Sequence, residues 1–395
     1  MFMQASNSFQ DRRLRIVIVF GSPGTSFGSV ERGFLELVKK LISKGFRIAV
    51  TVTAPGIFVE ELRKAGATVK IITMERRINL RAIYAIINVL KDYRPQILHI
   101  NFDIAVYNTL VAALVARFFG YQPCKIVVHH HSQIADPSKK QFRYLPRKLL
   151  YKLNHVESVF VSTAQRERFE LKGIVPYNGR QYVIENGVDT VTFHPVSSLN
   201  EKQDARHRIG LNLSPDVKVV GYVAGYRPEK RHIFLLEAFE EALRRTQHAG
   251  MIVLLLVGYG SEETRIKHEI VRRNLSQSVI MTGQRTDIPD IFRALDVAVC
   301  VSTNESFNLG IMEALATGLP VICVANSFTE TIIDTGINGI VMPSDVTAAE
   351  FGTMLASIIN SRLDASKMGG RGRAVAEAFS VSRWTDRILE VYISA

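Results

Sequence analysis

This sequence of 395 residues contains few cysteines and no long apolar run. Its three cysteines, Cys124, Cys300 and Cys323, are widely spaced and match no zinc-binding or redox pattern. Two of them lie within apolar runs, which is typical of buried thiols in a reducing compartment. The longest apolar stretches, such as residues 109–116, fall short of the roughly 20 residues that a membrane span needs. Residues 1–13 lack the apolar centre of a secretory signal. We therefore expect a cytoplasmic protein, whose surface can still rest against the inner face of a membrane.

Acidic residues are scarce in the first half of the chain. Residues 1–195 contain 28 Lys and Arg against 14 Asp and Glu, whereas the remainder contains 21 against 23. The first half therefore carries essentially all of the net positive charge, which is +12 for the whole chain. A basic domain of this kind predicts an anionic partner, either phosphate groups or acidic lipid headgroups. Nucleic acid is not expected, because no helix-turn-helix, zinc-finger or RNA-binding motif accompanies the charge.

The sequence does contain a regular alternation of short β-branched runs with helical patterns. Its hydrophobic fraction of 47% and charged fraction of 22% are those of a globular protein. Continuous apolar runs of this length are typical of buried parallel strands. Such strands are predicted at residues 15–20, 48–53, 69–72, 97–100, 126–128, 159–162 and 182–184, and then at 218–223, 251–257, 279–282, 297–301 and 319–324.

The alternation predicts an α/β fold of two doubly wound Rossmann-like domains that face each other across a cleft. A polar segment at residues 195–216 lacks a long apolar pattern and is interpreted as the linker. We expect an N-terminal domain at 1–195 and a second domain at 196–378. A C-terminal helix at 379–395, with an apolar stripe, is expected to pack back on the first domain.

The most informative segment is residues 302–320, STNESFNLGIMEALATGLP. Glu305 directly follows a buried strand, and a helix that begins near Ser306 or Phe307 would place its free backbone N–H groups beside it. Those groups and the helix dipole suit a diphosphate. Glu313, further along the helix, would accept hydrogen bonds from ribose hydroxyls. Taken alone, both glutamates are equally compatible with a loop residue and a solvated helix residue.

The E-x7-E spacing, followed directly by ALATGLPV at 314–321, resembles the signature of the family 4 retaining glycosyltransferases, which have the glycosyltransferase-B fold. Other landmarks follow the order of that family, and the resemblance runs from about residue 15 to 392. They are VIENGVD at 183–189, LVGYG at 256–260, DIPDIF at 287–292 with Asp296, and NGIVMP at 338–343.

The resemblance implies roles for the residues of this segment. Glu305 would bind the donor sugar and Glu313 the ribose, while the amides of Phe307, Asn308 and Leu309 would lie against the sugar and diphosphate. Many members have glycine at the place of Asn308. An asparagine can adopt a positive φ, but its side chain is expected to alter which sugar is accepted.

The resemblance also points to the basic turn at residues 223–231, VAGYRPEKR. An Arg and a Lys after this strand neutralise the leaving diphosphate in the family. Lys230 aligns with the Lys, whereas Gly225 stands at the place of the Arg. Arg227, two residues later, is the candidate replacement. Fixed cations at this point would stabilise the charge that develops on a departing nucleoside diphosphate.

Two further candidates follow strands of the first domain. The loop at residues 21–31 is not G-x-G-x-x-G, so a dinucleotide site is not supported. Gly28 stands where the family has a Gly-Gly pair, and it would let the backbone approach the donor phosphate or the acceptor. Alternation along the strand puts His129 and His131 on one face and His130 on the other. By resemblance His131 is the catalytic histidine near the donor sugar. No third metal ligand can be named, so neither a metal nor another cofactor is expected.

Residues 138–153, SKKQFRYLPRKLLYKL, form a basic amphipathic stretch. Such a stretch fits an anionic membrane or a phospholipid-like acceptor, and equally a solvated basic face over a packed helix. Pro146 is expected to break the helix in two.

The resemblance implies an enzyme that transfers a sugar from a nucleoside-diphosphate sugar to an acceptor hydroxyl with retention of configuration. UDP is favoured as the nucleotide and GDP is the rival. The acceptor is a glycan, a lipid-linked molecule or a small molecule, and an anionic membrane surface is a further candidate partner. Two alternatives stay open: a sugar-nucleotide 2-epimerase, against which the E-x7-E spacing counts, and a non-catalytic nucleotide-binding subunit of a glycosylation complex.

Overall fold

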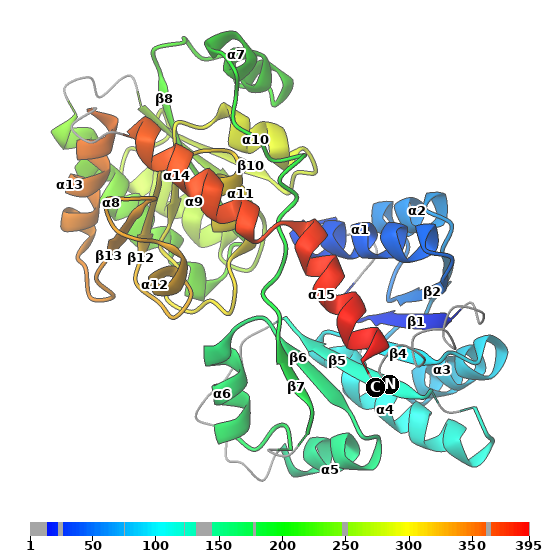
Figure 1. Ribbon diagram of the computed structural model, residues 1–395. Coiled ribbons are helices and arrows are strands. Elements are labelled where there is room, and N and C mark those ends of the chain that lie inside the picture. Colours follow the sequence, from blue (N-terminus) through cyan, green and yellow to red (C-terminus); the bar gives the residue numbers. More distant parts are fainter. Residues whose placement is uncertain are drawn as a thin grey trace, which may run out of the picture. The chain divides into compact units, whose positions relative to one another are not determined.

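The computed structural model describes residues 14–22, 27–74, 76–121, 123–131, 144–176, 179–246, 252–360 and 365–394. The chain forms two compact units (Figure 1). The first unit comprises Met1–Asn186 and Ser382–Ala395, and the second comprises Gly187–Val381.

The first unit is built on one parallel sheet in the order β3-β2-β1-β4-β5-β6-β7. Helices α1, α2 and α15 cover one face of this sheet and α3 to α6 cover the other (Figure 1). The central strands β1, β4, β5 and β6 are buried on both faces, whereas the edge strand β3 is mostly exposed. The strands are β1 (Arg15–Phe20), β2 (Arg47–Val52), β3 (Thr68–Ile71), β4 (Ile97–Asn101), β5 (Lys125–His130), β6 (Glu157–Phe160) and β7 (Gln181–Val183). The helices are α1 (Ser29–Ser43), α2 (Ile57–Lys64), α3 (Leu80–Tyr93), α4 (Asp103–Phe118), α5 (Leu145–Leu153), α6 (Thr163–Leu171) and α15 (Val381–Ile393).

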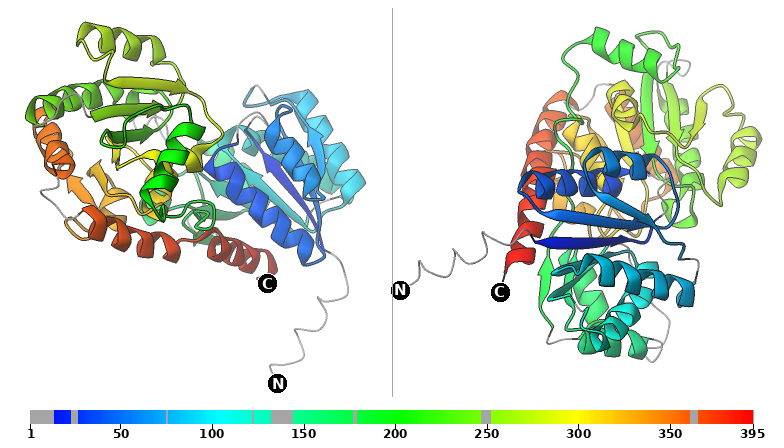
Figure 2. Two further views of the ribbon diagram at one scale, coloured as in Figure 1. Left: turned by 90° about the horizontal axis from the view of Figure 1, so that it is seen from above. Right: turned by 90° about the vertical axis from the view of Figure 1, so that its right-hand side faces the viewer.

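The second unit repeats this plan with a parallel sheet in the order β10-β9-β8-β11-β12-β13, and helices lie on both of its faces (Figure 2). The strands are β8 (Lys218–Val223), β9 (Ile252–Val257), β10 (Val279–Gly283), β11 (Val297–Cys300), β12 (Val321–Val324) and β13 (Ile340–Met342). The helices are α7 (Leu199–Arg208), α8 (His232–Arg245), α9 (Glu263–Arg272), α10 (Ile288–Ala294), α11 (Leu309–Ala316), α12 (Thr329–Ile332), α13 (Ala348–Ile359) and α14 (Ala365–Ala378), with a short 3₁₀ turn, η2, at Pro228–Lys230.

These sheets confirm the predicted fold class of doubly wound α/β units. In each sheet the order reverses beside the first strand, between β1 and β4 and between β8 and β11. Open parallel sheets bind their ligands outside the carboxyl ends of the strands at such a switch point. The strand order thus marks one candidate ligand-binding edge in each unit.

The interpretation of residues 195–216 as a linker is wrong in one respect, because helix α7 lies within it. Its residues are too polar to show an apolar stripe, and the helix is held by charge instead. Arg206, which is buried, donates to the carbonyl of Ala294 at 3.1 Å and to Asp296 at 2.8 Å, and Lys202 pairs with Asp296 at 2.9 Å. A second difference is strand β13, which is not among the strands predicted from the sequence.

The units divide the chain before Gly187 and after Val381, where residues 195 and 378 were expected. Val188 and Phe193 belong to the apolar core of the second unit, and Val188 forms a parallel bridge with Ser380. Helix α15 packs in the first unit. There Tyr392 OH lies 2.5 Å from His99 Nδ1, and Lys125 Nζ donates to the carbonyl of Val391 at 2.8 Å.

The cysteines lie as predicted for unpaired thiols. Cys300 in β11 and Cys323 in β12 are buried, and Cys124 is exposed.

Candidate active site

The site in the second unit begins with two neighbouring strands. Strand β8 pairs with β11, and the basic turn follows β8 while the segment with Glu305 follows β11. The two stretches therefore leave the sheet at the same edge, at the switch point. Lys230 and Glu305 are 75 residues apart in sequence, and this strand order brings them together.

Lys230 and Glu305 form an ion pair between Lys230 Nζ and Glu305 Oε1. Their side chains are only 12% and 10% exposed, so water screens the pair weakly. The backbone on both sides is fixed. Tyr222 OH donates to the carbonyl of Lys230 at 3.0 Å, and Ser302 Oγ donates to the carbonyl of Glu229 at 3.3 Å. The pair is thus held in place by neighbours that do not titrate at neutral pH.

Asn308 links Glu305 to helix α11. Its Nδ2 donates to Glu305 Oε1 at 3.0 Å and to Cys300 Sγ at 3.2 Å, while its Oδ1 accepts from the amide of Ile311 at 3.0 Å. Asn308 is therefore the N-cap, and the helix begins at Leu309 rather than near Ser306 or Phe307. Asparagine is among the preferred N-cap residues, which is the signal that would have located this start.

This arrangement corrects two expectations for Asn308. Its φ is −95°, so a positive φ is not needed. Both polar atoms of its side chain are occupied by protein contacts, so the side chain orients Glu305 instead of standing free toward a ligand.

The rest of the segment packs closely on β8. A Cβ built on Gly310 would lie 3.3 Å from the carbonyl oxygen of Val223, so a side chain here would press the helix off the strand. The ring of Phe307 packs on Phe328 at 4.8 Å, which leaves its backbone amide as the group available to a ligand. Glu313 lies one turn into α11, closer to its start than expected, and is 3% exposed.

Arg227 lies beside the position that lacks the expected arginine. A Cβ built on Gly225 would be 3.7 Å from Arg227 Nε, so the two positions share one space. Arg227 is 59% exposed and its Nε lies 3.1 Å from Glu229 Oε1.

The groups around the ion pair are neutral. Burial, with the positive charge of Lys230, lowers the pKa of His232 to about 4. Burial, with the negative charge of Glu305, raises the pKa of the Cys300 thiol to about 12. The pKa of Tyr222 is raised well above its usual value by burial, and Cys300 and Glu305 add to this shift. None of these three groups is set up to carry a proton during a reaction at neutral pH.

His131 directly follows β5 in the first unit. Its Nε2 lies 3.0 Å from Asn101 Oδ1, and its ring stacks on His129 at 4.1 Å. Burial lowers the pKa of His131 to about 3, although Asp103 acts in the opposite direction. Which ring nitrogen carries the proton depends on the orientation of the Asn101 amide, whose Nδ2 is also buried without a partner in the described part of the chain. Nδ1 of His131 is buried and likewise has no hydrogen-bond partner there.

His130 points to the opposite face from His129 and His131, as the strand alternation predicts. It stacks on Phe160 at 4.8 Å and lies 3.4 Å from Arg147. The described residues contain no group of three or more His, Cys, Asp or Glu that could hold a metal ion.

Gly28 is the N-cap of α1, with φ −87°. Its glycine character is therefore not required by a positive φ. A Cβ there would lie 3.2 Å from Glu31 Oε2, the atom that accepts from the Gly28 amide at 3.1 Å. Glu31 is a residue that the sequence analysis missed. Close packing instead requires a glycine at position 21 of this loop, because a Cβ on Gly21 would lie 2.8 Å from the side chain of Ile104. Residues 23–26 of the loop lie outside the described residues.

The basic stretch is described from residue 144 onward, and 138–143 lie outside the described residues. Pro146 occupies the first turn of α5 and does not break it, because a proline at the start of a helix needs no amide donor. Arg147 is buried, with Nη2 at 2.9 Å from Asp103 Oδ1 and 3.1 Å from Tyr151 OH. No helix among the described residues has both the length and the apolar character to cross a membrane.

Comparisons with known proteins show what the chain resembles. The family profile described as "Glycosyltransferase Family 4" matches residues 30–192, and that described as "Glycosyl transferases group 1" matches residues 203–375. The chain is 23% identical over 375 residues to the UDP-Gal:alpha-D-GlcNAc-diphosphoundecaprenol alpha-1,3-galactosyltransferase of Escherichia coli, and the match covers 92% of this chain and 93% of the relative. It is 28% identical over 219 residues to the lipopolysaccharide core biosynthesis mannosyltransferase LpsB of Rhizobium meliloti, a match that covers 54% of this chain and 60% of the relative.

Solved structures share the whole architecture. HepE from Anabaena, crystallised with UDP and glucose, superposes with a TM-score of 0.78 at 21% identity, over 97% of this chain and 100% of that chain. WaaG, described as a glycosyltransferase involved in lipopolysaccharide biosynthesis, has a TM-score of 0.71 at 13% identity, over 97% and 100%. At these identities the likeness shows the fold alone.

Proposed function

This chain is a glycosyltransferase of family 4 with the glycosyltransferase-B fold, and we propose that it transfers a sugar from a nucleoside-diphosphate sugar to an acceptor hydroxyl with retention of configuration. The observation that carries the proposal is the Lys230–Glu305 pair at the switch point of the second sheet. This edge combines a cation for a diphosphate, a carboxylate for sugar hydroxyls and the N-terminus of α11.

The pair implies an exchange of partners when the donor binds. A diphosphate oxygen replaces the Glu305 carboxylate at Lys230 Nζ, and a sugar hydroxyl then donates to Glu305. Asn308 keeps Glu305 oriented during this exchange, because its Nδ2 contact does not depend on Lys230. Glu313, one turn into α11, takes the ribose hydroxyls.

The reaction breaks the bond between the sugar C1 and the diphosphate oxygen and forms the bond between C1 and the acceptor oxygen on the same face. The acceptor proton passes to the departing diphosphate. Lys230, Arg227 and the amides of Phe307, Asn308 and Leu309 stabilise the negative charge on that leaving group. His131, which is neutral at pH 7, lies beside the donor sugar and contributes a hydrogen bond to it, and the backbone at Gly28 approaches the donor phosphate or the acceptor. The chemistry uses no metal or other cofactor.

The donor nucleotide is UDP in this proposal. The similar structure of HepE contains UDP and glucose, and the name of the E. coli relative specifies UDP-Gal. GDP is the rival. The acceptor is a glycan or a lipid-linked glycan, as the name of the same relative suggests, and the strongly basic first half suits an acceptor that bears phosphate.

The proposal is tested by measuring release of the nucleoside diphosphate and sugar transfer from a panel of UDP- and GDP-sugars. Lys230→Met and Glu305→Gln are each expected to lower kcat by about a hundred- to a thousandfold, because each removes stabilisation that the transition state needs. The double variant should lose little more than the worse single variant, since the two residues act together. The anomeric configuration of the product, read by NMR, tests retention.

Lys202→Met is the matched control. Lys202 is a half-buried lysine of the same unit, paired with Asp296 at 2.9 Å but away from the switch point. Its replacement should lower the melting temperature and leave kcat unchanged. If both Lys230→Met and Glu305→Gln had the wild-type kcat with the donor that the wild type uses, the assignment of the active site to these residues would be wrong. Binding of the nucleotide without turnover on any acceptor would instead favour a non-catalytic subunit.

A further inference from the structure

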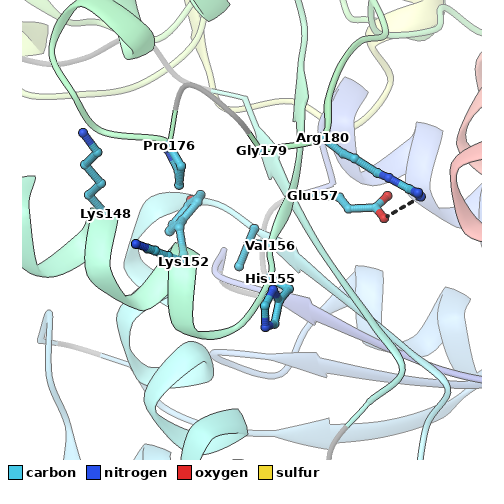
Figure 3. Close-up of a pocket in the computed structure, with 9 residues that line it drawn as sticks. Lys148, Lys152, His155, Val156, Glu157, Pro176, Gly179 and Arg180 are labelled. Atoms are coloured by element: carbon cyan, nitrogen blue, oxygen red, sulfur yellow. Dashed lines mark ion pairs between the residues drawn. The ribbon is translucent and has the colours of Figure 1, made fainter.

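A cavity lies in the first unit, at the end of helix α5. It has a volume of about 620 Å³ and is lined by the C-terminal half of α5 and by the residues that precede and begin β6 and β7 (Figure 3). Glu157 begins β6 and Arg180 directly precedes β7, so the cavity lies at the amino-terminal edge of the sheet. His131 follows the carboxyl end of β5, at the opposite edge. Within the first unit, the cavity and His131 therefore lie at opposite edges of the sheet.

The charge around the cavity is positive. Lys148, Lys152 and Arg180 line it, and Glu157 is its one lining carboxylate (Figure 3). Glu157 is already compensated, since it lies 3.6 Å from both Lys125 Nζ and Arg180 Nη1 and accepts from Tyr182 OH at 3.2 Å. Lys148 and Lys152 are exposed, and within the described part of the chain neither pairs with a carboxylate. Lys148 and Lys152 are thus the two lining cations that an anion can reach without displacing a carboxylate of the described residues.

Helix α5 is oriented about its axis so that a row of leucines faces solvent beside these lysines. Arg147 and Tyr151 are buried and bonded to each other, and Arg147 is paired with Asp103, so this polar side of the helix faces the protein. The opposite side is forced into solvent. The leucines there recur every four residues, which places them on one face. They are Leu145, Leu149 and Leu153, at 61%, 55% and 44% exposed.

We propose that the outward face of α5 and the cavity beside it form a docking surface for an anionic phospholipid bilayer. The leucines enter the interfacial layer, and Lys148, Lys152 and Arg180 bind headgroup phosphates, one of which enters the cavity. Charge complementarity carries the choice of partner, because this arrangement of apolar and cationic side chains is the one that interfacial helices use on anionic lipids. A free phosphate would explain the cations but not the exposed leucines. The proposal does not depend on the transfer reaction, and either can fail while the other stands.

The experiment is co-sedimentation of the full chain with vesicles of phosphatidylcholine alone and of phosphatidylcholine mixed with phosphatidylglycerol. We expect binding to the phosphatidylglycerol vesicles only, weakening as salt is raised. Lys148→Gln/Lys152→Gln and Leu149→Asn/Leu153→Asn should each lower the partition coefficient by roughly tenfold or more. Both double variants should keep the wild-type melting temperature and the wild-type rate with soluble substrates, since these side chains face solvent.

Two matched controls test the location. Lys44→Gln/Lys91→Gln removes two exposed charges elsewhere in the first unit, and Phe118→Asn removes an apolar side chain that is 88% exposed at the end of α4. Both should bind vesicles like the wild type. Equal binding to the two kinds of vesicle, or equal losses in a control variant, would overturn the proposal. Binding of inorganic phosphate that is lost in Lys148→Gln/Lys152→Gln, without any binding of the wild type to vesicles, would also overturn it, because it would identify a free phosphate site.

Discussion

Position 225 carries a glycine where the family has an arginine, and the surroundings still have room for a side chain. A Cβ there would lie at ordinary contact distances, 3.6 Å from the carbonyl of Tyr259 and 3.7 Å from Arg227 Nε. The guanidinium of Arg227 therefore lies next to the space that a side chain at position 225 would occupy. At the scale of single residues, we propose that Arg227 supplies the cation that position 225 lacks.

If Arg227 takes the role of an arginine at position 225, an arginine placed at position 225 should restore the activity that is lost when Arg227 is removed. Arg227→Ala should lower kcat/KM for the donor by about ten- to a hundredfold, because one of the two cations facing the diphosphate is removed. Gly225→Arg placed on the Arg227→Ala background should recover much of that loss. Steady-state kinetics with varied donor measure both effects.

The control for this pair is Arg265→Ala, which removes an arginine that is 65% exposed and paired with Glu262 on α9. It should leave kcat/KM unchanged. An Arg227→Ala enzyme with wild-type kinetics would show that Lys230 alone serves the diphosphate.

At the scale of elements, helix α11 is fastened to the site through its N-cap. Asn308 performs two tasks that are separable by mutation: Oδ1 caps the helix and Nδ2 orients Glu305. Asn308→Ala removes both, so stability should fall by about 1 kcal/mol and kcat should fall as well. Asn308→Ser keeps a hydroxyl for the cap but has no second group for Glu305, so stability should return while kcat stays low. Urea denaturation and kcat measured on the same preparations test this.

The cap of α13 provides the comparison. Thr347 Oγ1 accepts from the amide of Glu350 at 3.2 Å, far from the strand ends of the candidate site. Thr347→Ala should lose a similar amount of stability with no change in kcat. Wild-type activity in Asn308→Ser would show that Glu305 does not need its amide neighbour.

Helices α5 and α7 show what local patterns leave open. In each, a buried arginine forms an ion pair with a residue distant in sequence: Arg147 with Asp103 in α5, and Arg206 with Asp296 in α7. Periodicity of apolar residues detects helices that bury an apolar stripe. It cannot detect one whose buried face is an arginine, because the partner carboxylate lies elsewhere in the chain.

At the scale of the molecule, four histidines in β4 and at the end of β5 make the first unit sensitive to acid. Burial lowers the pKa of His99 and of His131 to about 3, and those of His129 and His130 well below the usual value. In the unfolded chain each takes up a proton near its ordinary pKa of about 6.5. Below that pH the unfolded state binds more protons than the folded one. Stability is therefore full above about pH 6.5 and falls as the pH drops toward 3, by up to about 1.4 kcal/mol per pH unit for each histidine.

Urea midpoints measured between about pH 7.5 and about pH 5 test this dependence. His129→Gln removes one of the four groups and should reduce the slope of stability with pH, whatever it does to stability itself. His268→Gln, at an exposed position of α9, should leave the slope as in the wild type. Equal slopes in wild type and His129→Gln would contradict the assignment of the acid sensitivity to this cluster.

The sequence by itself determined the two α/β units and the strands of both sheets apart from β13, because a buried parallel strand needs only a short run of apolar residues to be recognised. Through the family resemblance of the E-x7-E spacing and the basic turn after β8, it also predicted the residues of the candidate site, which stay a prediction. The tertiary structure decided which side chains meet. Lys230 pairs with Glu305 only because β8 lies beside β11 in the sheet, and Asn308 turns inward only because α11 begins at Leu309. Arg147 is buried, and the leucines of α5 are exposed, because Asp103 lies on the neighbouring helix. These outcomes depend on pairings between distant segments, whereas local periodicity records only which face of an element is apolar.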